Sequence, residues 1–200
     1  MEEIINDLGE EEMVTIEKRI QEDHIAFDKE KFVELWLYIA SESEGDERFG
    51  ATKLNKIFQY SDFEAYRELG KPITGADYKH IQEGAAPNQL LLVKQEIEGK
   101  DIDVVENKYY TQAQKRTVAR RKPDLSRFTR EELDIVDRVI ERLWLFDAMG
   151  VSKLSQGEFG YKLTQKDELI PYAFAYFLAT PLSEEQIQLG TQVAERHGLK

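Results

Sequence analysis

A helix that glycine and proline stop abruptly constrains the fold more than any other stretch of this chain. In residues 54–78, apolar or small side chains recur at spacings of three and four, which places them on one buried face of a helix. These side chains are Leu54, Ile57, Phe58, Ser61, Ala65 and Leu69. Thr52 is placed to cap the start of the helix. Gly70 suits its end, and Pro72 prevents it from resuming, so that the I-T-G sequence after it forms a turn.

The residue order around this helix is also distinctive. K-L-N-K-I-F-Q-Y-S-D occupies residues 53–62, and G-K-P-I-T-G-A-D-Y occupies residues 70–78. This order resembles the Panacea domain of SocA-like antitoxins and phage-associated proteins, whose signature is KL-x-KL-x-Y-x-AD, then G-x-P-ITG-x-x-Y. The matching residues are Lys53, Leu54, Lys56, Tyr60, Asp62, Gly70, Pro72, Thr74, Gly75 and Tyr78. The resemblance extends, less tightly, from about residue 29 to about residue 178.

The chain departs from the family pattern at two places. The family usually has Gly-Pro-Val where residues 84–87 read Gly-Ala-Ala-Pro, and this change reshapes the start of the next helix. The family often has Ser-x-x-(Thr/Ser)-His where residues 154–158 read Leu-Ser-Gln-Gly-Glu, without a histidine. No role of that histidine can therefore be transferred to this chain.

The resemblance implies a function. Panacea-domain proteins are typically antitoxins of bacterial and phage two-gene toxin–antitoxin pairs, and they neutralise unrelated toxins by direct protein contact. For this chain the resemblance implies a cognate protein toxin, encoded by the adjacent gene, and no enzymatic activity. A homo-oligomer is compatible with the sequence, which leaves the oligomeric state open.

The formal net charge of −12 is concentrated in one part of the chain. Residues 1–50 hold 16 acidic and 5 basic side chains, whereas the remaining 150 residues hold 23 and 22. We interpret residues 1–28 as an acidic N-terminal extension and residues 29–200 as a Panacea-like helical domain. A hydrated arm is favoured over an arm that binds a basic partner, because dense charge runs are usually just solvated.

The sequence lacks the residues that several kinds of functional site require. The chain has no cysteine, so a disulfide framework and a cysteine zinc site are excluded. It contains no apolar run of the roughly 20 residues that a membrane span needs, and its acidic start does not resemble a signal peptide, so a cytoplasmic protein is expected. Its histidines, His24, His80 and His197, are scattered, and no nucleotide-binding or hydrolase motif is present. We expect no metal and no cofactor, although an acid/base pair among the many carboxylates stays open.

The other predicted elements complete a mainly α fold, a single compact helical domain with a small β hairpin. A helix over residues 29–42 is capped by Asp28, and a β hairpin is expected over residues 101–119. Three further helices are predicted over residues 88–98, 130–148 and 183–197, the first of them led by Pro87. The helix over residues 130–148 opens on a capping box at Thr129, buries Trp144 and Met149, and ends at Gly150. Residues 157–160 are expected to form a loop.

One basic cluster, residues 114–122, and a concentration of aromatic side chains are the candidate contact features. The cluster is interpreted mainly as a solvated strand edge; contact with phosphates and contact with the acidic arm are the alternatives. The aromatic side chains are core residues or, where exposed, a partner-binding platform. The candidate partner-binding residues are Tyr66, Tyr78, Lys79, Gln82, Arg116, Arg120 and Arg121.

Three functions are therefore weighed. The first is an antitoxin that binds a protein toxin through the N-terminal arm and the surface of residues 78–122. The second is a phage-associated enzyme with a carboxylate site. The third is a DNA-binding autoregulator that uses residues 114–122, which the acidic composition disfavours because DNA repels an acidic protein.

Overall fold

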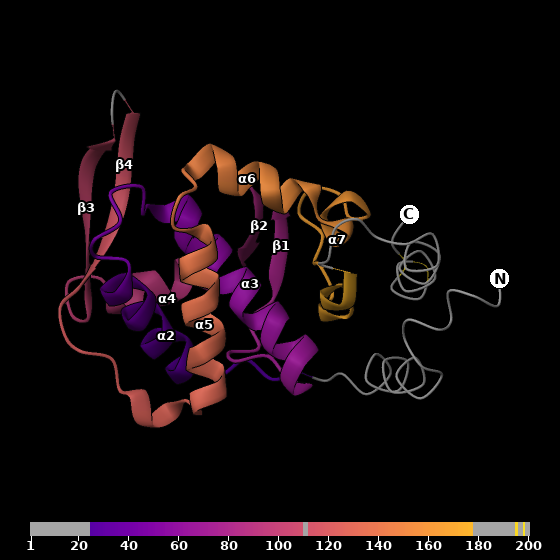
Figure 1. Cartoon of the computed structure of the whole chain (residues 1–200), viewed down its shortest axis with the longest axis horizontal. Coiled ribbons are helices and arrows are strands. Elements are labelled where there is room, and N and C mark those ends of the chain that lie inside the picture. Colours follow the sequence, from indigo (N-terminus) through magenta and orange to yellow (C-terminus); the bar gives the residue numbers. More distant parts are fainter. Residues whose placement is uncertain (1–24, 110–111, 178–194, 196–197, 199–200) are drawn as a thin grey trace.

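The computed structural model describes residues 25–109, 112–177, 195 and 198 (Figure 1). The α-helices are α2 (Lys29–Glu42), α3 (Ala51–Leu69), α4 (Leu90–Ile97), α5 (Arg130–Leu143), α6 (Ala148–Gly157) and α7 (Phe159–Lys162). The strands are β1 (Tyr78–Ile81), β2 (Gly84–Pro87), β3 (Ile102–Tyr109) and β4 (Gln112–Ala119), and two 3₁₀ segments are η1 (Leu125–Arg127) and η2 (Tyr172–Phe177). The mainly α fold is confirmed. The predicted N-terminal extension lies almost wholly outside the described residues.

Helix α3 lies at the centre of the fold, and the other elements surround it (Figure 1). Five of the six predicted face residues are buried, and the sixth, Leu69, is partly exposed near the end of the helix. Gly70 ends the helix in the left-handed conformation with φ of 77°, as predicted. The prediction of Thr52 as the cap is wrong, because Gly50 occupies that position and no side chain caps the helix.

A first antiparallel hairpin, β1–β2, packs on α3 and α6. Tyr78 pairs with Pro87 in this hairpin, so the prediction that Pro87 opens a helix is wrong. Helix α4 begins three residues later, at Leu90. The chain reverses at Gly84, whose φ of 95° is a conformation that other residues rarely adopt.

A second antiparallel hairpin, β3–β4, confirms the prediction for residues 101–119 and forms a wing at the edge of the molecule (Figure 1). An isolated two-stranded ribbon is only marginally stable, so it needs a surface to lean on. Strand β4 supplies that contact by packing against α2 and α3. The indole nitrogen of Trp36 in α2 donates a 3.3 Å hydrogen bond to the hydroxyl of Thr117 in β4.

The end of the helix predicted over residues 130–148 differs from the prediction. Helix α5 opens on the predicted capping box at Thr129 but ends at Leu143, and α6 begins only at Ala148. Asp147 caps the new helix by accepting a hydrogen bond from the backbone of Gly150, so this glycine lies inside α6 and does not end α5. Met149 is therefore exposed and not part of a buried stripe.

Two shorter segments near the end of the described chain also bear on the predictions. Helix α7 (Phe159–Lys162) forms where a loop was expected over residues 157–160. The predicted helix over residues 183–197 lies outside the described residues, apart from Glu195.

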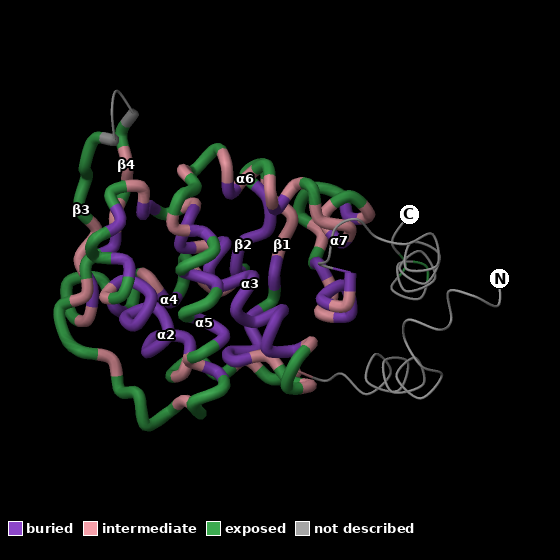
Figure 2. Tube along the Cα trace, viewed as in Figure 1, coloured by how far each residue is buried: buried purple, intermediate pink, exposed green. Residues whose placement is uncertain are grey.

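Buried residues follow α3 and the inner faces of α2, α5 and the β1–β2 hairpin (Figure 2). Stacked and edge-on aromatic rings fill this core, including Phe32 against Phe58 with centroids 4.3 Å apart. Among the described residues, no helix combines the length and apolar character needed to cross a membrane.

Candidate functional site

The signature aspartate on α3 is fully buried. Its carboxylate accepts hydrogen bonds from the backbone N–H of Thr74 at 2.7 Å, the hydroxyl of Thr74 at 2.5 Å, the hydroxyl of Tyr78 at 2.9 Å and the hydroxyl of Tyr172 at 3.1 Å. Burial raises the pKa of Asp62, and these donors oppose that rise because they stabilise the charged form. Asp62 therefore holds the I-T-G turn, strand β1 and η2 against α3.

The glycine of this turn is required by space as well as by conformation. Gly75 has φ of 68°, and a Cβ built on it would lie 2.4 Å from the carbonyl oxygen of Ala26. The backbone N–H of Asp28 donates a 2.8 Å hydrogen bond to the carbonyl of Thr74, so the segment leading into α2 is tied to the turn. A shallow cleft of about 300 Å³ lies where the two segments meet, next to Tyr66.

The first signature lysine joins two surface loops. Lys53 is almost fully buried, and its Nζ donates to the carboxylate of Asp46 at 2.5 Å. It also donates to the carbonyl oxygens of Trp144 and Phe146, each at 2.9 Å. Burial lowers the pKa of Lys53, and Asp46 counteracts this effect. One ammonium group thus fixes the α2–α3 loop and the α5–α6 turn to each other.

The second signature lysine holds the β1–β2 hairpin. The Nζ of Lys56 donates to the carbonyl of Ala85, whose own N–H donates at 3.1 Å to the hydroxyl of Ser155. That hydroxyl donates in turn to the side-chain oxygen of Gln59 at 3.0 Å. Burial lowers the pKa of Lys56 to about 7. A Cβ on Gly84 would lie 2.7 Å from the Lys56 Nζ, so glycine is needed for this close approach.

Two carboxylates lie near the signature tyrosine. The hydroxyl of Tyr60 donates to Glu158 at 3.1 Å, and Arg142 forms a 2.5 Å ion pair with Glu64 and stacks 4.9 Å from the Tyr60 ring centroid. Burial raises the pKa of Glu158 to about 7. Neither carboxylate lines either of the two described clefts. The described residues also contain no group of three or more His, Asp or Glu side chains that could hold a metal ion.

Arg116 of the basic cluster docks the wing onto helix α2. Its guanidinium donates to the carbonyl oxygens of Asp46 at 2.7 Å, Ser43 at 2.9 Å and Glu44. Ser43 is the C-terminal cap of α2, where unpaired carbonyls carry partial negative charge that a cation stabilises. The charge of Arg116 is thus used within the fold.

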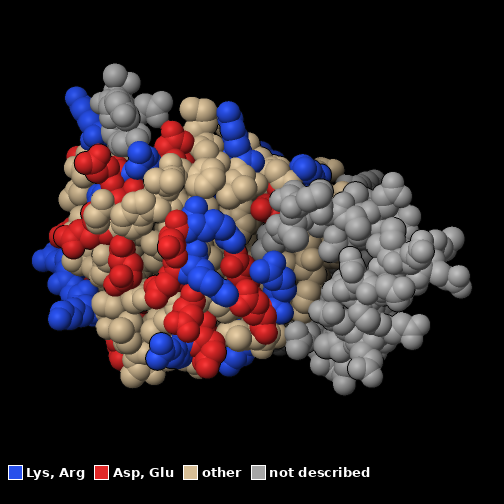
Figure 3. Space-filling view, in the orientation of Figure 1, with Lys and Arg blue, Asp and Glu red and all other residues tan. Residues whose placement is uncertain are grey.

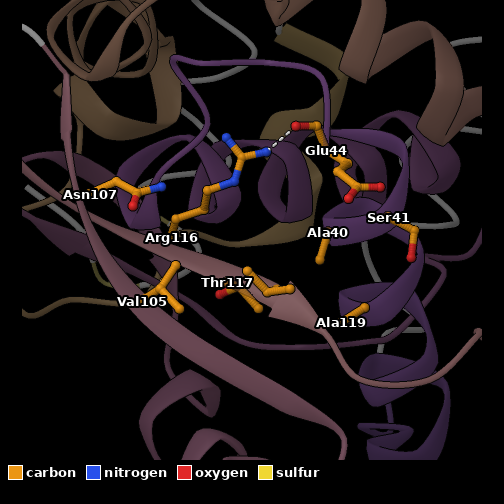
Figure 4. Close-up of a pocket in the computed structure, with 9 residues that line it drawn as sticks. Ala40, Ser41, Glu44, Val105, Asn107, Arg116, Thr117 and Ala119 are labelled. Carbon is orange, nitrogen blue, oxygen red and sulfur yellow. Dashed lines mark hydrogen bonds between the residues drawn. The ribbon is translucent and has the colours of Figure 1, made fainter.

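A cleft of about 320 Å³ lies between the wing and the end of α2 (Figure 4). It is lined by Ala40, Ser41, Glu44, Val105, Asn107, Arg116, Thr117, Val118 and Ala119. Its aliphatic side chains form apolar walls, and Figure 4 shows the Arg116 side chain rising from β4 toward the loop that carries Glu44. Such a cleft can accept one side chain of a partner by shape and polarity. Its two hydroxyls are engaged within the fold, since Ser41 donates to the carbonyl of Leu37 and Thr117 accepts from Trp36.

The predicted contact residues fall into two groups. Tyr66 and Tyr78 are each 1% exposed and belong to the core, so they cannot form an exposed aromatic platform. Lys79 is partly exposed and Gln82 is exposed on the β1–β2 hairpin, away from the wing. The sequence left open whether the tyrosines are core residues or an exposed platform, and the structure shows that Tyr66 and Tyr78 are core residues.

The other two arginines of the cluster are paired within the fold. Arg120 donates to the carbonyl of Gly99 at 2.8 Å and to Asp103 at 3.2 Å. Arg121 forms two hydrogen bonds with Glu34, at 2.7 and 2.8 Å, and one with Asp101 at 2.5 Å. The Glu34 hydrogen bonds raise the pKa of Arg121, and the same contact lowers the pKa of Glu34. The described acidic partners of these arginines thus come from α2 and the wing, not from the N-terminal arm.

Sequence reasoning did not anticipate the roles of Lys53 and Lys56. Lysine is among the residues least often buried, so a helix pattern assigns it to solvent. The available signal was the position of both lysines on the same helix face as apolar residues.

Comparison with known proteins identifies a family. A search of curated proteins finds no match. The family model described as "Antitoxin SocA-like, Panacea domain" matches residues 54–159, from α3 to the start of α7. This match spans more than half of the chain, and the protein therefore belongs to the SocA-like antitoxin family with a Panacea domain.

Proposed function

We propose that this protein is the antitoxin of a toxin–antitoxin pair and neutralises a cognate protein toxin by binding it directly. The observation that carries the proposal is how the fold uses the signature residues. Lys56 and Asp62, inside the family match, and Lys53, one residue before it, are buried and bonded to other parts of the fold. The shared residues therefore build a scaffold, and the exposed surface is free to differ between partners.

The wing is a suitable contact surface on this scaffold. Its hairpin exposes Val105 and Val118 beside the cleft at the end of α2. Arg116 fixes the wing to α2, so little conformational entropy is lost when a partner binds. We place the toxin contact on this part of the residue 78–122 surface, with the cleft receiving a toxin side chain.

Co-expression tests the proposal. The adjacent gene is expressed in a bacterial host with and without this protein, and growth is measured. Growth arrest by the neighbour alone and recovery with this protein are the expected results. Continued arrest with this protein present, at levels that match the toxin, would contradict the antitoxin function.

A variant pair tests the position of the contact. Val105→Asp with Val118→Asp is expected to weaken protection, because it places charge on the apolar wall of the cleft. Gln82→Asp with Lys79→Asp, on the other hairpin, is the comparison for the wider residue 78–122 surface. Loss of protection only in this second variant would move the contact to the β1–β2 hairpin.

The two alternative functions find less support. The three arginines needed for DNA contact are bonded to carbonyls and carboxylates, which reduces the charge available to phosphates. The enzyme alternative requires facing carboxylates in a deep pocket. Glu64 and Glu158 lie near each other, but Glu158 accepts a hydrogen bond from Tyr60, Glu64 is paired with Arg142, and neither described cleft reaches them.

A further inference from the structure

The α5–α6 junction exposes three large apolar side chains. Leu145 is 78% exposed, Met149 58% and Phe146 37%. In Figure 3, an uncharged area lies above the red and blue stripe that covers α5, over this junction. Monomeric proteins rarely expose adjoining large apolar side chains, and such patches often mark binding sites.

The backbone that carries these side chains is held rigidly. Lys53 binds the carbonyls of Trp144 and Phe146, and Asp147 caps α6 through the N–H of Gly150. Burying a lysine is costly unless its donors are satisfied, and here three acceptors satisfy them. The apolar side chains are therefore presented in a fixed arrangement, which lowers the entropic cost of binding.

Acidic side chains lie beside this apolar junction. Glu44 and Glu47 lie in the α2–α3 loop on either side of Asp46, and Asp46 binds the same Lys53 ammonium as the junction carbonyl of Phe146. Glu141 lies one turn before Leu145. All three are exposed and form no ion pair with another described residue. Arg48, next to Glu47 in the same loop, and Lys153, one turn beyond Met149, offset only part of this charge. Negative charge thus borders the junction on two sides.

Helix α4 provides an instructive contrast. Leu91 and Leu92 are 70% and 66% exposed there, so apolar exposure alone does not distinguish the two places. The neighbouring charges on α4 are paired, Lys94 with Glu98 and Glu96 with Lys29. Of these two sites, the junction alone combines exposed apolar side chains with unpaired carboxylates. This combination selects a partner by charge.

We infer that the α5–α6 junction binds an apolar groove on the toxin, and that lysine or arginine side chains of the toxin border this groove. Leu145, Phe146 and Met149 fill the groove, and Glu44 and Glu47 face the basic border. This inference rests on the proposed function and specifies the surface chemistry of the toxin. Glu44 also lines the wing cleft, so the junction and the wing form neighbouring parts of one contact face.

Four double variants test this inference by growth protection and by the affinity of the purified complex with the toxin from the adjacent gene. Leu145→Ser with Met149→Ser, and Glu44→Lys with Glu47→Lys, are each expected to weaken binding at least about tenfold. Leu91→Ser with Leu92→Ser and Glu96→Lys with Glu98→Lys are the matched controls. They alter α4, which is bound to the opposite end of the 14-residue, roughly 20 Å helix α2, and are expected to bind as wild type.

Added salt separates the charge effect from the apolar effect. It is expected to weaken the wild-type complex, because it screens Glu44 and Glu47, and to leave the charge-reversed complex unweakened. Wild-type binding by both junction variants would overturn this inference and leave the antitoxin function intact. Weakening by the serine variant alone would contradict the basic border. Failure of the wild-type protein to protect would contradict the proposed function, and this inference with it.

Discussion

The hydroxyl of Tyr78 donates a 2.9 Å hydrogen bond to the buried carboxylate of Asp62, sixteen residues earlier in the chain. Tyr172, 110 residues from Asp62, donates to the same carboxylate oxygen at 3.1 Å. A single carboxyl group in α3 therefore organises strand β1 and η2, which pack on one another through edge-on tyrosine rings. Burial raises the pKa of Asp62, and the hydrogen-bond donors around it oppose that rise and replace the water that the group has lost.

Replacing this carboxylate should destabilise the fold strongly. Asp62→Ala leaves several buried donors without an acceptor, and we expect the free energy of unfolding to fall by about 3 kcal/mol. Tyr172→Phe removes one donor and leaves the others in place, so a loss of about 1 kcal/mol is expected. Urea unfolding followed by circular dichroism measures both. Equal unfolding midpoints for Asp62→Ala and the wild type would contradict the role of Asp62.

The I-T-G turn should tolerate no side chain at its glycine. Gly75→Ala combines a positive φ with a contact of 2.4 Å to the Ala26 carbonyl, and we expect a loss of more than about 2 kcal/mol. Gly99→Ala is the matched control, because its φ of 80° is similar but its Cβ meets no atom within 4 Å. It should cost only the backbone strain, about 1 kcal/mol. Thermal unfolding compares them, and equal losses would show that the close approach is unimportant.

Helix α3 and the wing were predictable because their signals are local. The apolar period of α3 and the stop at Gly70 occur within the segment itself, as do the β-branched residues of β3. The β1–β2 hairpin lacked such signals, since each strand has only four residues and β2 reads Gly-Ala-Ala-Pro. The tertiary contact of Lys56 with Ala85 helps to hold this hairpin in place.

The candidate site was harder to predict because its contacts are distant in sequence. Arg116 reaches carbonyls 70 to 73 positions away, and no local pattern distinguishes it from the exposed arginines beside it. The end of α5 was hard to predict for the same reason. Lys53 binds carbonyls 91 and 93 positions away, in the turn that interrupts the predicted helix. Periodicity continued through this turn and wrongly placed Met149 in the core.

Removing the guanidinium of Arg116 should loosen the wing. Arg116→Met loses the hydrogen bonds to three carbonyls at the end of α2, and we expect a loss of about 2 kcal/mol with faster amide exchange in β4. Arg116→Lys should fall in between, because an ammonium keeps the charge but not the planar fork. Arg120→Met is the control at an exposed position, with an expected loss below about 1 kcal/mol. Unchanged exchange in β4 of Arg116→Met would contradict the docking role.

The raised pKa of Glu158, about 7 against an ordinary 4.5, should make stability depend on pH in a defined direction. Burial outweighs the opposing effects of Tyr60, Arg142 and Lys162, while Glu64 adds to the rise. Between about pH 4.5 and pH 7 the folded protein binds a proton at Glu158 that the unfolded chain has released. The contribution of Glu158 to stability is therefore full below pH 4.5 and is lost as the pH rises through 7.

Glu158→Gln should remove this pH dependence while keeping an acceptor for the hydroxyl of Tyr60. We expect the variant to match the wild type near pH 4 and to exceed it at pH 8 by at most about 3 kcal/mol, because each unit of pKa shift corresponds to about 1.4 kcal/mol. Urea unfolding from pH 4 to pH 8 measures the difference. Glu106→Gln, on the exposed surface of β3, should leave the profile unchanged. Parallel profiles for Glu158→Gln and the wild type would show that the pKa of Glu158 is the same in the folded and the unfolded chain, and that Arg142 and Lys162 offset its burial.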